Sequence, residues 1–188
     1  MKIKIKEITE GCMPEIIKVG DWIDLCTAEE YTLKCPHAKM LHKHKNKGKK
    51  EGEEEVIVER SRDVVFNYIL LNLGVAMQIP KGYEAYLLPR SSSFKKWGII
   101  QTNSQGIIDE SYCGNDDIWK MPILSTRNVT IPKGTPIAQF RIQLSQKATL
   151  WQKIKWLFSS KVELVKVDNL EGENRGGFGT GSDKYRTK

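Results

Sequence analysis

The chain has 188 residues and a net charge of +7, with 30 Lys and Arg against 23 Asp and Glu, and its mean hydropathy is −0.45. One domain with a substantial core is the simplest arrangement at this length. The start alternates lysine and isoleucine, which predicts a strand rather than a signal peptide, and no stretch is as long and apolar as a transmembrane helix. The four cysteines lack the paired spacing of a zinc site or a disulfide framework. We therefore expect a cytoplasmic protein with reduced thiols.

Short stretches rich in Val, Ile, Tyr and Phe recur along the chain between glycines and prolines. They predict strands at residues 2–8, 56–59, 64–72, 75–79, 83–88, 129–131, 137–144 and 162–167. The polar, turn-like residues 102–106 lie between two pairs of isoleucines, which predicts a β-hairpin. No spacing typical of a β-α-β unit occurs. The fold class is therefore all-β, either a sandwich or a barrel.

Residues 36–55 pass directly from a basic run into an acidic one and contain little that a core could bury. This composition predicts a charged, flexible insertion. Four possible zinc ligands lie in or beside it, namely Cys35, His37, His42 and His44. They lack a paired ligand spacing and lysines surround them, so a solvated loop is favoured over a metal site.

Residues 145–160 form a second insertion, and they predict one short helix near 149–158. Leu150, Ile154 and Leu157 fall on one helical face beside two aromatic residues, while lysines occupy the other face. We expect the apolar face to pack on its own barrel or on a neighbouring subunit. Contact with a membrane or a partner protein is the alternative.

The segment around the predicted hairpin concentrates residues that suit phosphate chemistry. Arg90 can donate two parallel hydrogen bonds to phosphate oxygens, and the hydroxyls of Ser91 and Ser92 follow it. Asp109 ends the second strand of the hairpin, where a carboxylate can hold and deprotonate a water molecule. Tyr112 follows three residues later and offers a rigid ring as a pocket wall.

Five motifs, taken in order, resemble those of the trimeric dUTP diphosphatases (dUTPases), in particular a phage and Bacillus-type branch. They are Gly20-Asp21-Trp22-Ile23-Asp24-Leu25, Pro89-Arg90-Ser91-Ser92, Asn103 to Gly114, Lys133-Gly134-Thr135-Pro136-Ile137-Ala138-Gln139 and Arg175-Gly176-Gly177-Phe178-Gly179. Any single motif has an ordinary structural explanation, but five in this order indicate the family. The resemblance implies a jelly-roll-like β-barrel that forms a homotrimer with active sites at subunit interfaces. Residues 1–168 would form this domain, and the glycine-rich residues 169–188 would be a flexible tail that closes over the active site.

The resemblance also implies an activity, the hydrolysis of dUTP to dUMP and pyrophosphate with Mg²⁺ as cofactor. This reaction limits the incorporation of uracil into DNA and supplies dUMP. Asp109 would be the catalytic base, and Asp24 would hold the metal through water. The substrate-binding residues would be Arg90, Ser91, Ser92, Asn103, Gly106, Ile108, Tyr112, Gln139, Arg175 and Phe178.

The chain departs from the family pattern in its fifth motif. Arg175 and Phe178 are three residues apart, whereas the family's RGxGGFG places two more residues between them. Two residues of extended chain span about 7 Å. Either Arg175 reaches the phosphates differently, or another aromatic residue covers the base, and Trp119 and Phe94 are the candidates by position. Ser92 also stands where many members have glycine.

Three other functions compete with this one. A dCTP deaminase shares the fold, but residues 118–124 contain no glutamate that could serve as its base. A regulatory protein would use the nucleotide site to control contacts with a partner protein through the insertions. A nucleic-acid-binding barrel would suit the lysines, but aromatic and basic residues do not interleave along one strand. We therefore expect neither stable nucleic-acid binding nor membrane association.

Overall fold

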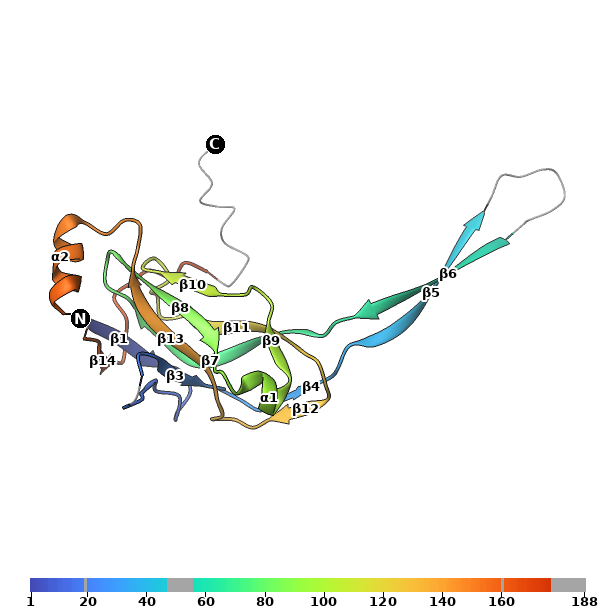
Figure 1. The fold of residues 1–188 in the computed structure, drawn as a ribbon, viewed down its shortest axis with the longest axis horizontal. Helices are drawn as coiled ribbons and strands as arrows, with labels where there is room; N and C mark the ends of the chain where they lie inside the picture. The colour runs from blue at the N-terminus through green and yellow to red at the C-terminus, as the bar shows by residue number, and fades with distance from the viewer. Residues whose placement is uncertain (19, 47–55, 160, 177–188) are drawn as a thin grey trace.

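The computed structural model describes residues 1–18, 20–46, 56–159 and 161–176 (Figure 1). The strands are β1 (Lys2–Glu7), β2 (Glu15–Ile16), β3 (Ile23–Cys26), β4 (Tyr31–Leu33), β5 (His37–Asn46), β6 (Val56–Val65), β7 (Tyr68–Gln78), β8 (Tyr83–Pro89), β9 (Ile99–Gln101), β10 (Gly106–Asp109), β11 (Ile118–Ser125), β12 (Val129–Ile131), β13 (Pro136–Leu144) and β14 (Glu163–Lys166). The helices are α1 (Ser93–Trp97) and α2 (Leu150–Phe158). This content confirms the predicted all-β class.

Two five-stranded sheets enclose the core of a jelly-roll-like fold. Their strand orders are β14-β1-β7-β11-β9 and β10-β8-β13-β3-β2. Side chains alternate across each strand, so that Tyr83, Ala85 and Leu87 of β8 are buried while the residues between them are half-buried. Trp119 of β11 and Phe140 of β13 are fully buried, and their ring centroids lie 5.1 Å apart in an edge-on contact between the sheets.

The predicted β-hairpin is not a paired hairpin. β9 pairs with β11 and β10 pairs with β8, so the two strands lie in different sheets. Each strand is hydrogen-bonded on one side to a longer neighbour. The turn between them, residues 102–105, crosses from one sheet to the other and includes Ser104 at a positive φ of 59°. The segment is therefore a corner of the barrel.

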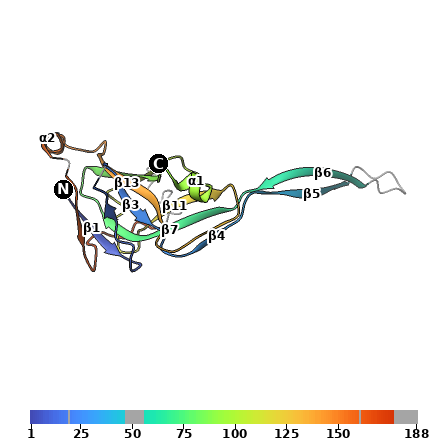
Figure 2. The same ribbon diagram turned by 60° about the horizontal axis from the view of Figure 1, so that its bottom comes forward.

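The charged insertion is also more regular than expected. Residues 37–46 form β5, which pairs with β6 over ten residues in an antiparallel ribbon, so the predicted loop is wrong for this part. The register runs from His37 opposite Val65 to Asn46 opposite Val56. The ribbon extends well away from the two sheets in both views (Figures 1 and 2).

The predicted helix near 149–158 is confirmed as α2, but most of its apolar face is exposed and only Ile154 on it is half-buried. The helix is attached by Gln152, whose amide donates to the Lys81 carbonyl oxygen at 2.6 Å, and by Trp156, whose ring lies 5.7 Å from that of Tyr83. The opposite face is exposed, with Leu150, Trp151, Leu157 and Phe158 between 72% and 87% accessible. Neither described helix is long and apolar enough to cross a membrane.

Candidate functional site

Asp109 is the last residue of β10, the edge strand of its sheet. One carboxylate oxygen accepts hydrogen bonds from the Ser111 hydroxyl and backbone N–H, the latter at 2.8 Å, and the other pairs with Nη1 of Arg175 at 3.0 Å. Burial raises the pKa of Asp109, but the hydrogen bonds from Ser111 and the charge of Arg175 together outweigh it and hold that pKa below its ordinary value. The carboxylate is therefore ionised at neutral pH, as a base must be to accept a proton.

Tyr112 is fixed beside Asp109 by the turn that follows β10. Its backbone N–H donates to the Asp109 carbonyl oxygen at 3.1 Å, and its hydroxyl donates to the Ile118 carbonyl oxygen at 3.0 Å. The residue is 7% exposed and belongs to the core, and burial raises the pKa of its phenol to about 12. Tyr112 therefore offers a rigid neutral ring, which suits the predicted role of pocket wall.

The predicted base-binding residues lie on or next to β10. Within the described residues, β10 has a strand neighbour on one side only, so its outer edge offers alternating backbone N–H and C=O groups. The Ile108 side chain lies in the core, and Gly106 is buried, so both can contribute through their backbones. Asn103 is exposed in the preceding turn, and its amide oxygen accepts a hydrogen bond from Gln101 at 2.7 Å.

A second group of predicted residues gathers around Asp24 on β3. Nε of Arg90 lies 3.0 Å from Oδ2 of Asp24, which is only 6% exposed. Gln139 of β13 is the register partner of Asp24, and its amide donates to the Pro89 carbonyl oxygen at 3.3 Å. Burial raises the pKa of Asp24, while Arg90 opposes this shift and the neighbouring Glu15 adds to it. The structure thus brings together the predicted residues of three motifs.

The surroundings of Asp24 suit a cation that keeps most of its water. Its second carboxylate oxygen, Oδ1, is buried and has no hydrogen-bond partner. The described part of the chain contains no cluster of three or more His, Cys, Asp or Glu side chains that could enclose a metal ion. One hard oxygen donor without a cage fits Mg²⁺ bound through water and substrate phosphates.

The serines after Arg90 divide between two roles. Ser93 is buried, and its hydroxyl donates to the Ile137 carbonyl oxygen at 2.8 Å, so it anchors the start of α1 on β13. Ser91 is exposed and Ser92 is half-buried at the N-terminus of α1, where its side chain makes no capping hydrogen bond. The hydroxyls of Ser91 and Ser92 are therefore the ones placed to meet a ligand beside Arg90.

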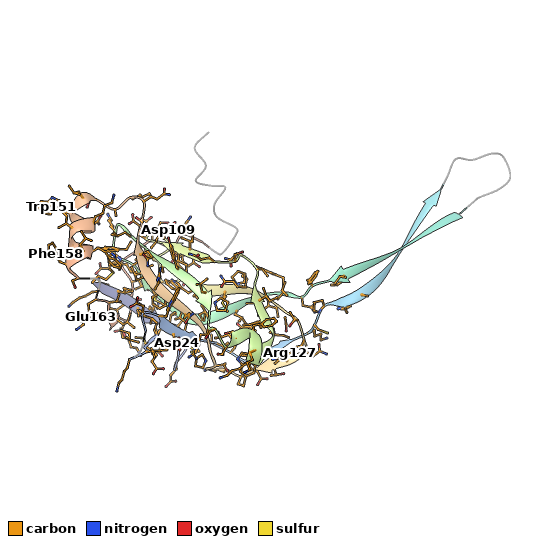
Figure 3. All side chains as sticks on the ribbon, viewed as in Figure 1. Asp24, Asp109, Arg127, Trp151, Phe158 and Glu163 are labelled. Carbon is orange, nitrogen blue, oxygen red and sulfur yellow. The ribbon has the colours of Figure 1, made fainter. Side chains whose placement is uncertain are left out.

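Within one chain, the residues around Asp109 and the residues around Asp24 lie far apart. In the register of the sheet, Asp109 lies opposite Glu84 of β8. Asp24 lies opposite Gln139 of β13, and Gln139 in turn lies opposite Leu88 of β8. The two aspartates are thus three strands apart across the sheet and four residues apart along it, or about 20 Å. Figure 3 shows them toward opposite edges of the sheet. Register partners point to the same face of a sheet, and Glu84 and Leu88 are an even number of residues apart on β8. Both carboxylates therefore lie on the same outer face.

The aromatic residues proposed to cover a base differ in outcome. Trp119 is fully buried between the sheets, so that suggestion is wrong. Phe94 on α1 is 60% exposed. Phe178 lies outside the described residues, and its predicted contact remains a prediction.

Sequence reasoning missed Asp117, which holds the tail in place. Asp117 is 1% exposed, and its carboxylate accepts backbone hydrogen bonds from Gly114 at 2.9 Å, Arg175 at 3.0 and 3.1 Å, and Gly176 at 3.2 Å. The run Asn115-Asp116-Asp117 after a glycine is a pattern typical of side chains that bind nearby backbone groups, and it was the available signal.

Comparison with known proteins identifies a family. A family model described as dUTPase matches residues 53–155. The SPbeta prophage-derived deoxyuridine 5'-triphosphate nucleotidohydrolase YosS of Bacillus subtilis is 38% identical over 186 residues, which cover 98% of this chain and 100% of that protein.

Solved structures show the same fold. A mutant dUTPase from phage phi11 of S. aureus, whose description mentions a structural Mg(II) ion, superposes with a TM-score of 0.54 at 17% identity over 79% of this chain and 94% of that one. The dUTPase of Staphylococcus bacteriophage 80alpha gives a TM-score of 0.54 at 18% identity over 79% and 93%. With the family model covering more than half of the sequence and one relative aligned over nearly all of it, the chain belongs to the dUTPase family.

Proposed function

We propose that this dUTP diphosphatase uses Asp109 as its catalytic base, in an active site completed by Arg90, Gln139 and Asp24 of a second copy. The observation that carries the proposal is the ionised Asp109 carboxylate at a strand edge, paired with Arg175 and fixed beside the buried ring of Tyr112. Hydrolysis of dUTP to dUMP and pyrophosphate is the activity of the family.

In this mechanism, Asp109 takes a proton from a water molecule, and the water oxygen attacks the α-phosphorus of dUTP. The bond from the α-phosphorus to the bridging oxygen breaks, and pyrophosphate leaves with the electron pair. Phosphoryl transfer of this kind depends mainly on positioning and on neutralising charge. Arg90 and Arg175 supply positive charge on the two sides of the triphosphate, and Ser91, Ser92 and Gln139 donate further hydrogen bonds.

Asp24 would hold Mg²⁺ through water while the phosphates bind it directly, and the ion would supply charge neutralisation. The unpartnered buried oxygen of Asp24 supports this assignment. Asp24 would contribute by accepting hydrogen bonds from water around the cation.

Selectivity for uracil would come from the outer edge of β10. Uracil presents one N–H donor between two carbonyl acceptors, and the backbone at Gly106 and Ile108, with the Asn103 amide, offers the complementary groups. Cytosine would leave buried groups unpaired, which discriminates strongly. The Tyr112 ring would pack under the deoxyribose and leave no room for a 2′-hydroxyl.

The separation of the two residue groups supports an assembly of identical chains, and we propose the homotrimer of the family. The apolar face of α2 fits the same arrangement, because α2 is attached at Lys81 and the next residue, Gly82, donates its backbone N–H to Glu110, the neighbour of Asp109. A copy that completes the site at Asp109 would therefore approach α2.

Trp151→Ala with Phe158→Ala should lower the oligomeric mass measured by light scattering, whereas Lys153→Ala should not. An unchanged mass for the double variant would contradict the contact.

The activity is tested by incubating the purified protein with Mg²⁺ and dUTP, dCTP, dTTP or UTP, and by measuring pyrophosphate and ammonia separately. We expect pyrophosphate from dUTP alone, and Asp109→Asn should lower kcat at least about 100-fold. Asp168→Asn, an exposed acid away from the site, is the matched control. Ammonia from dCTP would reassign the chain as a deaminase. The absence of both products with every nucleotide would favour a regulatory binding protein.

The β5–β6 ribbon favours a second role in binding a partner protein. It pairs with no other strand in the described structure and extends beyond the barrel, and a lone two-stranded ribbon is marginally stable in water. The 80alpha dUTPase is described as one of the phage dUTPases that control transfer of virulence genes.

The role of the ribbon can be tested by removing it. Because Ala38 and Val64 are register partners, an Asn-Gly turn can replace residues 39–63. Full dUTP hydrolysis by that variant would support a role outside catalysis, and lost hydrolysis by a folded variant would refute it.

A further inference from the structure

The amide side chain of Gln101 links the two sheets at the turn of residues 102–105. Gln101 is the last residue of β9 and is 7% exposed. Its Nε2 donates two hydrogen bonds, one to the Leu87 carbonyl oxygen of β8 at 3.3 Å and one to Oδ1 of Asn103 at 2.7 Å. A side chain of the first sheet is therefore bonded both to the second sheet and to the residue that we propose contacts the base.

These two bonds fix which way the Asn103 amide faces. A backbone carbonyl oxygen can only accept hydrogen bonds, so the nitrogen of Gln101, and not its oxygen, must face Leu87. The same nitrogen faces Asn103, which must therefore turn its acceptor, Oδ1, toward it. Asn103 is exposed, and among the described residues none accepts a hydrogen bond from its Nδ2. The Asn103 amide is thus held with its N–H donors free to meet a ligand.

The remaining polar atom of Gln101 is unfavourable for stability. Its Oε1 is buried and has no hydrogen-bond partner within the described part of the chain. A buried acceptor without a donor destabilises a protein, whereas methionine would fill a similar space without that cost. The glutamine therefore requires another explanation, and the two hydrogen bonds that it donates supply one.

Gly106, at the start of β10, lies against the same amide. A Cβ on Gly106 would lie 3.2 Å from Cβ of Leu87 and 3.5 Å from Nε2 of Gln101. Leu87 is also the register partner of Gly106. Two of the residues proposed to face the base, Asn103 and Gly106, are therefore packed around the Gln101 amide, which holds the Asn103 donors beside the start of β10.

We propose that Gln101 is a positioning residue that makes the site select a pyrimidine with a carbonyl group, rather than an amino group, at ring position 4. The fixed Asn103 amide presents N–H donors, which the 4-carbonyl oxygen of uracil accepts. The 4-amino group of cytosine is itself a donor, so it would meet the Asn103 amide donor to donor and leave both groups unpaired. This inference rests on the proposed function, because it deepens the role of Asn103 in binding the base.

The first test replaces the donor by an apolar side chain of similar length. Gln101→Met frees the Asn103 amide to turn and offer its oxygen to cytosine. The ratio of kcat/KM for dUTP to that for dCTP should therefore fall about tenfold to a hundredfold. The corresponding ratio for dUTP to dTTP should stay the same, because thymine also carries a 4-carbonyl group. An unchanged dCTP ratio, or an equal fall in both ratios from a loosened pocket, would overturn the proposal.

Two further variants separate positioning from other effects of the substitution. In an Asn103→Ala background, Gln101→Met should leave the dCTP ratio unchanged, because no amide remains to be oriented. Gln78→Met is the matched control: Gln78 lies on β7 and its Oε1 is likewise buried without a described partner, so both ratios should stay at the parent values. An equal fall in the dCTP ratio with and without Asn103 would overturn the positioning role.

Asn103→Asp tests the direction of the amide even if Gln101→Met fails to fold, because Asn103 is exposed. One carboxylate oxygen would accept the hydrogen bond from Gln101 and the other would face the base as an acceptor. The dCTP ratio should therefore fall further in Asn103→Asp than in Asn103→Ala. Equal ratios in these two variants would show that the outward group does not read ring position 4, and the proposal would be overturned.

Binding of dUMP and dCMP, measured by calorimetry, keeps the inference separate from the proposed activity. These ligands carry the base without the bond that is hydrolysed, so the preference for dUMP in their Kd values should fall in Gln101→Met as the kinetic ratio does. Selective dUTP hydrolysis by the parent with an unmoved preference in the variant would refute the inference alone. A parent that hydrolyses no nucleotide, but whose preference for dUMP falls in the variant, would refute the activity and support the inference.

Discussion

Replacing Arg90 by alanine should destabilise the protein through Asp24. The change removes the positive charge 3.0 Å from a carboxylate that is 6% exposed and whose other oxygen already lacks a partner. A buried charge without a counter-charge is costly, but the group can take up a proton instead. The cost of that protonation at pH 7 is bounded at about 4 kcal/mol, from an unfolded pKa near 3.9.

The expected cost is below this bound because the site is partly open. The Arg90 side chain is 31% exposed, so water can reach the carboxylate once the guanidinium is gone. We expect Arg90→Ala to lower the free energy of unfolding by about 2 kcal/mol at pH 7. The penalty should shrink as the pH falls toward 4, because protonating Asp24 then costs less.

Asp24→Asn is the matched background for this measurement. Burial raises the pKa of Asp24 above that of the unfolded chain, so ionisation of Asp24 costs stability, increasingly as the pH rises through the folded value. Asp24→Asn should therefore be more stable than the parent at pH 7, and the difference should vanish at low pH. In that background Arg90→Ala should cost little. Urea unfolding at fixed protein concentration measures all four proteins, and an equal cost of Arg90→Ala in both backgrounds would refute the reasoning.

Three further changes test other parts of the structure. Ser111→Ala removes the side-chain hydrogen bond, which is the largest of the contributions that lower the pKa of Asp109, and leaves the backbone bond in place. The acid limb of the kcat/KM profile should therefore move to higher pH, and an unmoved limb would contradict the assignment of Asp109 as base. Gln152→Ala removes half of a capping box and the bond to Lys81, so it should lower the free energy of unfolding by about 1–2 kcal/mol and reduce the helical circular dichroism. Unchanged values would show that α2 is held by other contacts. Burial and the neighbouring Cys26 raise the pKa of the Cys12 thiol to about 12, so the folded protein should leave Cys12 unalkylated at pH 8, and rapid labelling would show that the thiol is open.

Much of the candidate site could be proposed from the sequence because its residues lie close together along the chain. Arg90 with its serines, and Asp109 with Tyr112, each lie within a few residues of one another, so motif and chemistry point to the same place. Strand alternation likewise predicted most of the sheet. One exception is β7, which runs through Gly74 where a break was expected; Gly74 has a φ of 70°, and Cys12 packs where its Cβ would be.

Long-range pairing could not be predicted in the same way. The distance between Asp24 and Asp109 depends on the strand order β10-β8-β13-β3, which no local pattern encodes. The isoleucines around residues 102–105 predict two strands correctly, but not that these strands join different sheets. For α2, periodicity predicted the helix, whereas Gln152 and Trp156 decide which face meets the barrel.

The two halves of the site share an electrostatic design, from which we infer how substrate prepares its own hydrolysis. Each half pairs a carboxylate with a guanidinium at 3.0 Å, Asp24 with Arg90 and Asp109 with Arg175. Arg175 helps to hold the pKa of Asp109 below its ordinary value, and Arg90 opposes the rise that burial causes in the pKa of Asp24. A triphosphate that enters between the halves competes for both arginines, because phosphate oxygens match the guanidinium fork as well as a carboxylate does. Asp109 would then be separated from Arg175 when the phosphates are neutralised, which is when its proposed role as base requires it to take a proton from water.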